Sequence, residues 1–189
     1  MIISPNMLKL VTESEQKFKE RYVEHVSEIS LSAPFKKGKE IHALANYFLK
    51  GQNIEKLENS LDKNRAYIWK TLKENQYFNM ECVDCEYGIQ ARLDKFWIGG
   101  RIDALVKEGK NYYILDYKTG QIPKNATFDF QTMVYLYCVD KLIKDYESLN
   151  FVYIGLKENV SEKIDFDKKI AEKYKELILK GCLQIEKLL

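Results

Sequence analysis

Apolar residues recur at helical spacing through the first 76 positions of the chain. From Pro5 to Val26 they follow steps of three and four residues, and Ser4 before Pro5 is a typical helix start. The same spacing predicts helices from Gly38 to Gly51, where glycine suits a C-terminus, and from Ile54 to Glu74. Residues 29–35 are expected to connect the first two helices. The chain therefore opens with a mainly helical portion.

From residue 77 onward, apolar and polar residues alternate in short segments, which is the pattern of strands. Tight turns are expected where Asp94-Lys95 and Glu108-Gly109-Lys110 interrupt the alternation. The last expected strand follows a helix, so it can return beside the sheet through a right-handed crossover. The fold class predicted is α/β, with a mixed central sheet flanked by helices and an N-terminal helical portion. The expected elements are strands at 77–93, 96–106, 111–117 and 150–156, and helices at 127–144 and 165–188.

Composition limits the class of protein. The 189 residues are enough for one domain with a sizeable core, and we expect a single domain over 1–189 that is strand-rich in 77–189. Hydrophobic residues make up 46% and charged residues 31% of the chain, which excludes disorder as a description of the whole. No segment has the pattern of a signal peptide or a membrane span, so a cytoplasmic location without membrane contact is expected.

Net charge alone does not identify a partner. Thirty lysines and arginines oppose 28 aspartates and glutamates, which gives a net charge of +2. To bind a phosphate-rich partner, such a chain would need positive groups gathered on one face and a bound cation to offset the phosphate charge.

The four cysteines do not form a complete metal-site pattern. Cys82 and Cys85 form one C-x-x-C inside an apparently extended segment, whereas Cys138 and Cys182 stand alone. A zinc site would need a second pair or histidines at ligand spacing, and a redox pair would open a helix after a strand. We therefore expect reduced thiols.

Asp116 and Lys118 are the first candidates for chemistry. They stand two apart on a strand, so their side chains share one face of the sheet, while Tyr117 points the other way, toward the core. If the strands pair across Glu108-Gly109-Lys110, Asp103 lies level with Asp116. Two carboxylates held together are unfavourable unless a cation lies between them, and such oxygen-rich sites suit Mg²⁺ or Mn²⁺. A solvated ion pair at a strand end is the simpler interpretation of Asp116 and Lys118 alone.

Hydrolysis of a phosphodiester bond needs the groups that these positions offer. A metal held by Asp103 and Asp116 can polarise a phosphoryl oxygen and activate a bound water. The ammonium of Lys118 can steady the attacking water or the developing charge. Gly99 and Gly100 precede Asp103 and would relieve crowding where a substrate backbone approaches.

The order and spacing of these residues resemble the core of the PD-(D/E)XK nuclease superfamily. Gly100-Arg101-Ile102-Asp103 with Leu115-Asp116-Tyr117-Lys118-Thr119-Gly120 is similar to its RecB-like branch. Three further features agree with that branch. They are Gly38-Lys39-Glu40-Ile41-His42 (a glycine, three residues, then histidine), the acidic Glu86 upstream of the first aspartate, and Gln131-Thr132-Met133-Val134-Tyr135 with its glutamine–tyrosine pair.

The resemblance implies a metal centre with defined ligands. His42 would be a ligand together with Asp103, Asp116 and the carbonyl oxygen of Tyr117. The ion would be Mg²⁺ or Mn²⁺, and Lys118 would be the catalytic lysine.

The resemblance also implies roles outside the ligand set. Glu86 would join the catalytic carboxylates. Gln131 and Tyr135 stand four apart on one helix face, where they would orient Lys118 and contact DNA. Arg101 would bind the substrate.

Some relatives of the RecB-like branch hold an iron–sulfur cluster with one cysteine in the N-terminal helix and three near the C-terminus. Here that helix has no cysteine, and Cys182 is the only one near the C-terminus, so no cluster is expected. The helicase domains of large recombination enzymes are missing as well. We therefore expect a stand-alone nuclease module, with a helicase or another repair protein as its partner.

Three functions remain open from the sequence. The first is an active metal-dependent deoxyribonuclease, an exonuclease in DNA repair, recombination or mobile-element processing. The second is a catalytically inactive DNA-binding or partner-docking module of the same fold, which would be expected to have lost a charged position. The third is an unrelated α/β enzyme that uses the two aspartates on another phosphate substrate, which leaves His42 and the glutamine–tyrosine pair unexplained.

Overall fold

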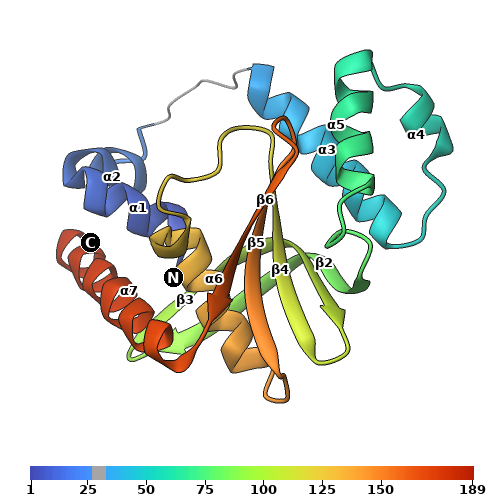
Figure 1. Ribbon diagram of the computed structural model, residues 1–189. Helices are drawn as coiled ribbons and strands as arrows, with labels where there is room; N and C mark the ends of the chain where they lie inside the picture. The colour runs from blue at the N-terminus through green and yellow to red at the C-terminus, as the bar shows by residue number, and fades with distance from the viewer. Residues whose placement is uncertain (27–32) are drawn as a thin grey trace.

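The structure of the protein is a computed structural model that describes residues 1–26 and 33–189, and for 33–37 the backbone alone (Figure 1). Helices dominate the first part of the chain and strands the second. The strands are β1 (Ile2–Ile3), β2 (Glu81–Leu93), β3 (Phe96–Glu108), β4 (Asn111–Lys118), β5 (Ser148–Gly155) and β6 (Val160–Phe166). The helices are α1 (Pro5–Glu13), α2 (Glu15–Tyr22), α3 (Ala33–Leu49), α4 (Glu55–Asn59), α5 (Lys63–Lys73), α6 (Phe130–Leu142) and α7 (Lys168–Leu188), with a short 3-10 turn, η1 (Ala126–Phe128).

The strands form one mixed sheet in the order β1-β3-β4-β5-β6, and β2 pairs with β3 as well. The long β2–β3 hairpin turns at Asp94-Lys95, and β3 and β4 are antiparallel across Gly109 and Lys110, as the turn chemistry predicted. After α6 the chain returns to the sheet, and β5 lies parallel to β4. The prediction of an α/β fold with a mixed central sheet is confirmed.

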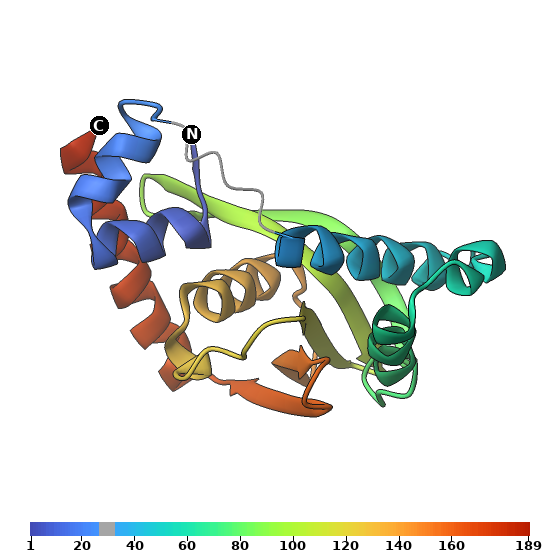
Figure 2. The ribbon, with the colours of Figure 1, turned by 90° about the horizontal axis from the view of Figure 1, so that it is seen from above.

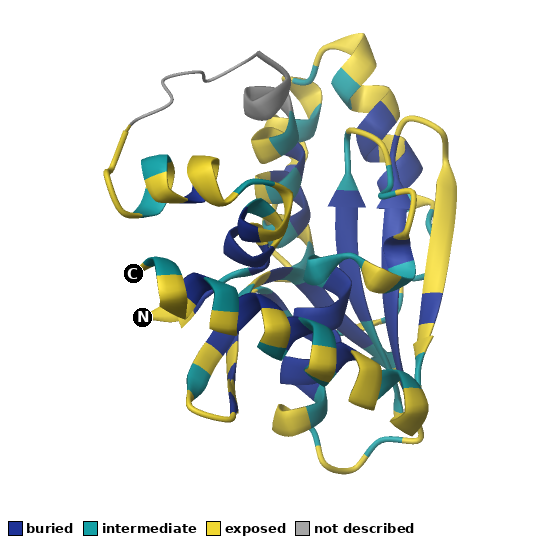
Figure 3. Ribbon diagram, turned by 90° about the vertical axis from the view of Figure 1, so that its left-hand side faces the viewer, coloured by how far each residue is buried: buried dark blue, intermediate teal, exposed yellow. Residues whose placement is uncertain are grey.

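Helices cover both faces of the sheet and define two hydrophobic cores (Figure 2). The helices α1, α6 and α7 pack on one face around Leu8, Val134 and Ile178, and we call this the α6 side. The helices α3 and α5 pack on the other face around Ile41 and Leu72, which is the α3 side. The central strands β4 and β5 lie between these layers (Figure 3). β5 is buried along most of its length, and β4 is buried from Ile114 to Tyr117.

Two predicted helices are each divided in the structure. The first breaks at Ser14, whose extended backbone ends α1 while its hydroxyl accepts a hydrogen bond from Lys17 and caps α2. The third breaks at residues 60–62, where Asp62 caps the start of α5. In both places a capping side chain overrides an apolar spacing that continues across it, so the prediction of continuous helices was wrong.

Other element boundaries also differ from the prediction. The helix α3 begins at Ala33, within the expected loop 29–35, whose residues 29–32 lie outside the described part of the chain. It ends as predicted before Gly51, which has a φ of 69°. The short strand β1 and the edge strand β6 were missed. Most of β6 is exposed, and its polar sequence was merged into the expected closing helix, which begins at Lys168.

The β2–β3 hairpin changes the face it presents to each core at Glu86. On β2, Ile89 packs on the α6 side, whereas Cys85, four residues away, packs on the α3 side. On β3, Ile102 packs on the α6 side and Ala104 on the α3 side. Residues an even number apart on a regular strand would share a face. The reversal coincides with the left-handed backbone of Glu86, whose φ is 51°.

Candidate active site

The strands β3 and β4 separate where the candidate carboxylates lie. Their pairing ends at Ala104 and Leu115, one position before Asp103 and Asp116, which places these two aspartates level with each other, as the register predicted. Beyond that point the side chain of Asp103 replaces the next strand–strand hydrogen bond, because its Oδ2 accepts from the backbone N–H of Tyr117 at 2.8 Å. The carboxylate of Asp103 is therefore held in the opening between the two strands.

His42 reaches this opening from α3. Its Nδ1 lies 3.0 Å from Asp103 Oδ1, and its Nε2 lies 3.0 Å from the carbonyl oxygen of Tyr117. Both ring nitrogens face acceptors, so the arrangement favours the doubly protonated imidazolium. Burial lowers the pKa of His42, but the hydrogen bond and negative charge of Asp103 outweigh it and raise this pKa to about 8.

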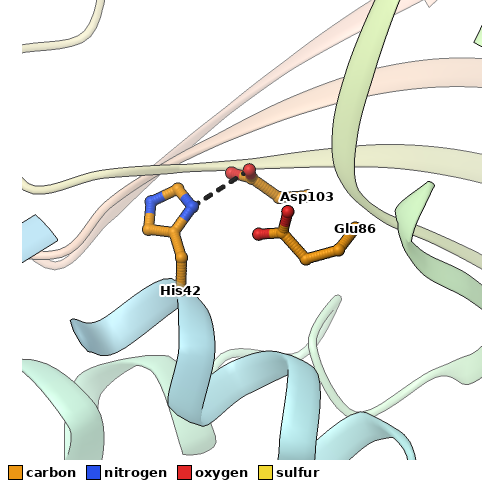
Figure 4. Close-up of side chains that lie close together, drawn as sticks. All are labelled: His42, Glu86 and Asp103. Atoms are coloured by element: carbon orange, nitrogen blue, oxygen red, sulfur yellow. Dashed lines mark hydrogen bonds and ion pairs between the residues drawn. The ribbon is translucent and has the colours of Figure 1, made fainter. Parts of the chain in front are cut away.

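Glu86 completes a group of three side chains that could hold a metal ion (Figure 4). One ligand atom from each of His42, Glu86 and Asp103 lies within 4.8 Å of the others. The left-handed backbone at Glu86 directs its carboxylate toward Asp103 on the neighbouring strand. Glu86 also lies 3.6 Å from the guanidinium of Arg101, whose side chain is 71% exposed.

Asp116 and Lys118 project to the α6 side, where Gln131 joins them. The Nε2 of Gln131 donates to Asp116 Oδ1, and its Oε1 accepts from the Lys118 ammonium at 2.9 Å. The ammonium also lies 2.8 Å from Asp116 Oδ2. Burial and the negative charge of Asp103 raise the pKa of Asp116 to about 6, although the positive charge of Lys118 lowers it in part.

Two residues that the sequence analysis missed support this group. The Lys118 ammonium lies 5.3 Å from the centre of the Tyr153 ring on β5, which gives it a cation–π partner. Asp129 caps α6 by accepting a hydrogen bond from the backbone N–H of Gln131. A polar residue directly before an apolar helix is the signal that could have identified Asp129, but no periodic signal identifies Tyr153.

The structure gives the glycines before Asp103 a different role from the one expected. A Cβ on Gly100 would lie 2.9 Å from the ring and the hydroxyl of Tyr135, and a Cβ on Gly99 would lie 2.2 Å from the carbonyl oxygen of Ile89. The crowding comes from the protein itself. Tyr135 is 7% exposed and lies outside the cleft, whereas Arg101, Lys118 and Tyr117 line it.

A cleft of about 620 Å³ runs past this group between α3, the hairpin and the end of β4. One wall is α3, from which Gly38, His42 and Asn46 project at intervals of four residues. Thr119 lies opposite, and a Cβ on Gly38 would approach its Oγ1 to 3.2 Å. The glycine of the upstream motif therefore lets α3 lie close to the end of β4, where His42 meets Tyr117.

A comparison with family models decides the family. Residues 57–187 match the model described as the PD-(D/E)XK nuclease superfamily. The chain belongs to the PD-(D/E)XK nuclease superfamily. The matched region contains both aspartates, Lys118 and Gln131, whereas His42 lies before it, so the place of His42 in the site rests on its contacts.

Solved structures share the fold of this superfamily member at low sequence identity. A proposed exonuclease from Eubacterium rectale matches over 99% of this chain and 80% of its own, with a TM-score of 0.63 and 10% identity. The crystal structure of SSO0001 matches over 96% of this chain and 75% of its own, with a TM-score of 0.53 and 16% identity. A comparison with curated proteins finds no match.

Members of the PD-(D/E)XK superfamily use divalent metals, and the donor set here fits such an ion. Carboxylate oxygens, an imidazole and a carbonyl oxygen are suitable ligands for Mg²⁺ or Mn²⁺. Asp116 Oδ2 is buried and makes no hydrogen bond; its contact is the ion pair with Lys118. The acceptors around His42, Asp103 Oδ1 and the Tyr117 carbonyl oxygen, also attract positive charge, so a cation suits this place electrostatically.

No cysteine is among the described residues that line this cleft, although the Cys85 thiol donates to Asn46 Oδ1 at 3.2 Å and Asn46 does line it. Cys82 and Cys85 are free thiols on β2, which is extended as expected, and Cys138 and Cys182 are buried on the α6 side. Burial raises the pKa of Cys82 to about 12. Within the described ranges 1–26 and 33–189, no helix is both long and apolar enough for a membrane span.

Proposed function

We propose that this protein is a metal-dependent deoxyribonuclease of the RecB-like branch, which hydrolyses phosphodiester bonds as an exonuclease. One observation carries the proposal: His42, Asp103, Asp116 and Lys118 converge where β3 and β4 separate. All the charged positions of the motif are present. An inactive binding module would be expected to have lost at least one of them. The exonuclease mode is supported by the likeness to the proposed exonuclease from Eubacterium rectale.

The proposed metal ligands are His42, Asp103, Asp116 and the carbonyl oxygen of Tyr117, and the proposed ion is Mg²⁺ or Mn²⁺. When bound, the ion supplies positive charge to a phosphoryl oxygen and lowers the pKa of a coordinated water. Glu86 would act as a further carboxylate, because the group it forms with His42 and Asp103 is compact.

Lys118 would act as the catalytic lysine. Its ammonium is held between Gln131, Asp116 and the Tyr153 ring, while a quarter of the side chain stays exposed at the cleft. A positive group fixed in this way can stabilise the negative charge that develops on a phosphate oxygen without first having to reorganise. Gln131 positions Lys118, and Arg101 at the cleft rim would bind a phosphate of the substrate.

The proposal extends to the setting of the reaction. We propose a single domain that acts on DNA in the cytoplasm, in repair, recombination or mobile-element processing, with a helicase or another repair protein as a partner. No iron–sulfur cluster is included, because the four cysteines do not follow the pattern of one in the N-terminal helix and three near the C-terminus. The alternative function is a catalytically inactive DNA-binding or partner-docking module of the same fold.

Incubation of the purified protein with linear and circular DNA, single- and double-stranded, tests the proposal. Each substrate would be combined with Mg²⁺, Mn²⁺ or a chelator, and Asp116→Ala and Lys118→Ala would be run in parallel. Shortening of linear DNA with a metal, lost in both variants and with the chelator, is expected. Cleavage that survives both substitutions would refute the site, and binding without cleavage under any metal would establish the alternative.

A further inference from the structure

Beyond Glu86, the β2–β3 hairpin has one covered face and one open face. On the covered face, Ile89, Ala91 and Ile98 pack into the core of the α6 side. The helices α1 and α6 lie on that side of the hairpin in Figure 2. The residues that point the other way form three cross-strand pairs, which we call the outer hairpin face: Gly88 with Arg101, Gln90 with Gly99, and Arg92 with Trp97.

No described residue outside the hairpin is known to pack against this face, so packing within the described part of the chain does not account for its aromatic ring. Trp97 is 48% exposed although it lies in a paired strand, and Gln90 and Arg92 are exposed as well. A large aromatic ring left half in water on a regular strand is a feature of recognition surfaces. Arg92 donates through Nε to the carbonyl oxygen of Asp94 at 2.8 Å, which fixes its guanidinium near the hairpin turn.

The outer hairpin face leads directly into the candidate active site. Glu86 stands two positions from Gly88 on β2, and Asp103 stands two positions from Arg101 on β3, beyond the pair of Tyr87 and Ile102. Arg101 lines the cleft and lies 3.6 Å from the Glu86 carboxylate. At about 3.3 Å per residue, Trp97 lies about 20 Å along β3 from Asp103, which is within the reach of a few nucleotides of an extended strand.

The side chains on this face match the chemistry of a single nucleic-acid strand. Arg101 and Arg92 stand at opposite ends of the face and can each contact a phosphate. The ring of Trp97 can stack on a base, whose faces are accessible in a single strand but covered by neighbours in a duplex. Gly88 leaves open space beside Arg101, since a Cβ there would meet nothing within 4 Å.

We infer that the outer hairpin face is a track for single-stranded nucleic acid, on which Trp97 stacks a base about 20 Å from the carboxylates. This inference rests on the proposed nuclease function and names its substrate class: a strand that passes Trp97, Arg92 and Arg101 before it enters the cleft. Trp97 would determine specificity for single strands. It would act on substrate binding and leave the chemical step unchanged.

Intrinsic fluorescence tests the track without any cleavage. The chain has two tryptophans, Trp69, which is 3% exposed on α5, and Trp97, so quenching by a base reports on Trp97. Oligothymidylate added at low salt with a chelator should quench the emission, and blunt duplex at equal concentration should quench it much less. Trp69→Phe should keep the quenching and Trp97→Phe should lose it. Equal quenching by duplex, or quenching that survives Trp97→Phe, would overturn the inference.

Cleavage kinetics provide the second readout. With oligothymidylates of increasing length, KM should fall until the strand reaches Trp97 and then level off. Trp97→Ala should raise KM about tenfold for long strands and leave kcat and the KM of the shortest strands unchanged. Tyr67→Ala removes a similarly exposed aromatic ring from α5 and serves as the control. An unchanged KM in Trp97→Ala, with a normally folded and active protein, would overturn the inference.

The experiments distinguish failure of the proposed nuclease function from failure of the proposed single-strand track. Quenching that depends on Trp97, in a protein that cleaves nothing, would refute the nuclease and leave the track in place. Cleavage without any contribution of Trp97 would do the reverse. Binding of a second copy of this chain at Trp97, seen as a concentration-dependent dimer that Trp97→Ala abolishes and that oligothymidylate does not disperse, would also overturn the track.

Discussion

The side-chain amide of Gln131 joins Asp116 to Lys118, because its Nε2 donates to Asp116 Oδ1 while its Oε1 accepts from the Lys118 ammonium at 2.9 Å. One helical residue thereby sets the relation between the proposed metal ligand and the proposed catalytic lysine. The orientation of the amide is fixed from α6, where Asp129 holds the backbone of Gln131.

Removal of this amide should reduce catalysis more than substrate binding. Gln131→Ala removes one of the three contacts that hold the Lys118 ammonium and leaves the ion pair with Asp116 and the Tyr153 ring. It is expected to lower kcat about 10- to 100-fold, with little change in KM, as substitution of supporting groups around a metal ligand does. Steady-state cleavage of a labelled linear DNA measures this effect. Gln52→Ala, at an exposed glutamine in a loop, is the control. A kcat within twofold of the wild type would rule out this positioning role.

Metal affinity should depend most on Asp103. This carboxylate contacts His42 and also holds the Tyr117 backbone, so Asp103→Asn removes a proposed ligand and weakens the support of two others. We expect calorimetric Mn²⁺ affinity to fall at least about 100-fold in Asp103→Asn and by less in Glu86→Gln.

The control for metal binding is Asp145→Asn, an exposed carboxylate paired with Lys110 at the far end of the sheet. It should bind Mn²⁺ like the wild type. If Asp103→Asn and Asp145→Asn bound the ion equally well, the ion would not be held at the separation of β3 and β4.

A double substitution can test the crowding at Gly100. Gly100→Ala would place a methyl group against the Tyr135 ring, and overpacking of this kind costs about 1–3 kcal/mol. At about 2–4 °C of Tm per kcal/mol, calorimetry should record a clear drop. In a Tyr135→Ala background the added methyl group should cost little. A Gly100→Ala cost that is the same in both backgrounds would mean that some other contact requires the glycine.

The pairing of α4 with α5 should respond to acid. Glu58 accepts hydrogen bonds from Lys73 at 2.7 Å and from the Trp69 indole, and these partners lower its pKa. A carboxylate whose pKa is lower in the folded than in the unfolded protein stabilises the fold at pH values above its unfolded-state pKa. This contribution is lost as the pH falls through its folded-state pKa.

Glu58→Gln should therefore lower the Tm at pH 7, by an amount that corresponds to about 1 kcal/mol or less for a partly exposed pair. The difference from the wild type should disappear in acid, below the folded pKa of Glu58. Thermal unfolding across this pH range measures it, with Glu74→Gln, an exposed helix-terminal pair with Lys70, as the control. A difference that persists in strong acid would assign the effect to packing.

The sequence predicted those parts of the fold that depend on neighbours along the chain. The turn at Asp94-Lys95 sets the register of β2 and β3. The turn at Gly109 sets the register of β3 and β4, and with it the meeting of Asp103 and Asp116. The edge strand β6 was not predicted, because most of its residues are exposed and polar and do not alternate regularly with apolar ones. The break between α1 and α2 at Ser14 was not predicted, because the helical spacing of apolar residues continues across this capping residue.

The candidate site was predictable as a set of residue types, but its geometry was not. Gln131 was expected to orient Lys118, and the structure adds its bond to Asp116. The contribution of Tyr153 and the burial of Tyr135 under Gly100 depend on how α6 lies across the sheet. Such contacts join segments far apart in the chain, and no local pattern encodes them.

The backbone of Glu86 connects stability and activity at a single position. A non-glycine residue at a φ of 51° costs about 1 kcal/mol, so Glu86→Gly should raise the Tm while Mn²⁺ affinity falls. The chain keeps a carboxylate where its backbone would prefer glycine. Selection for thermal stability would therefore tend to replace Glu86, and the most stable variants from such a selection would have low nuclease activity.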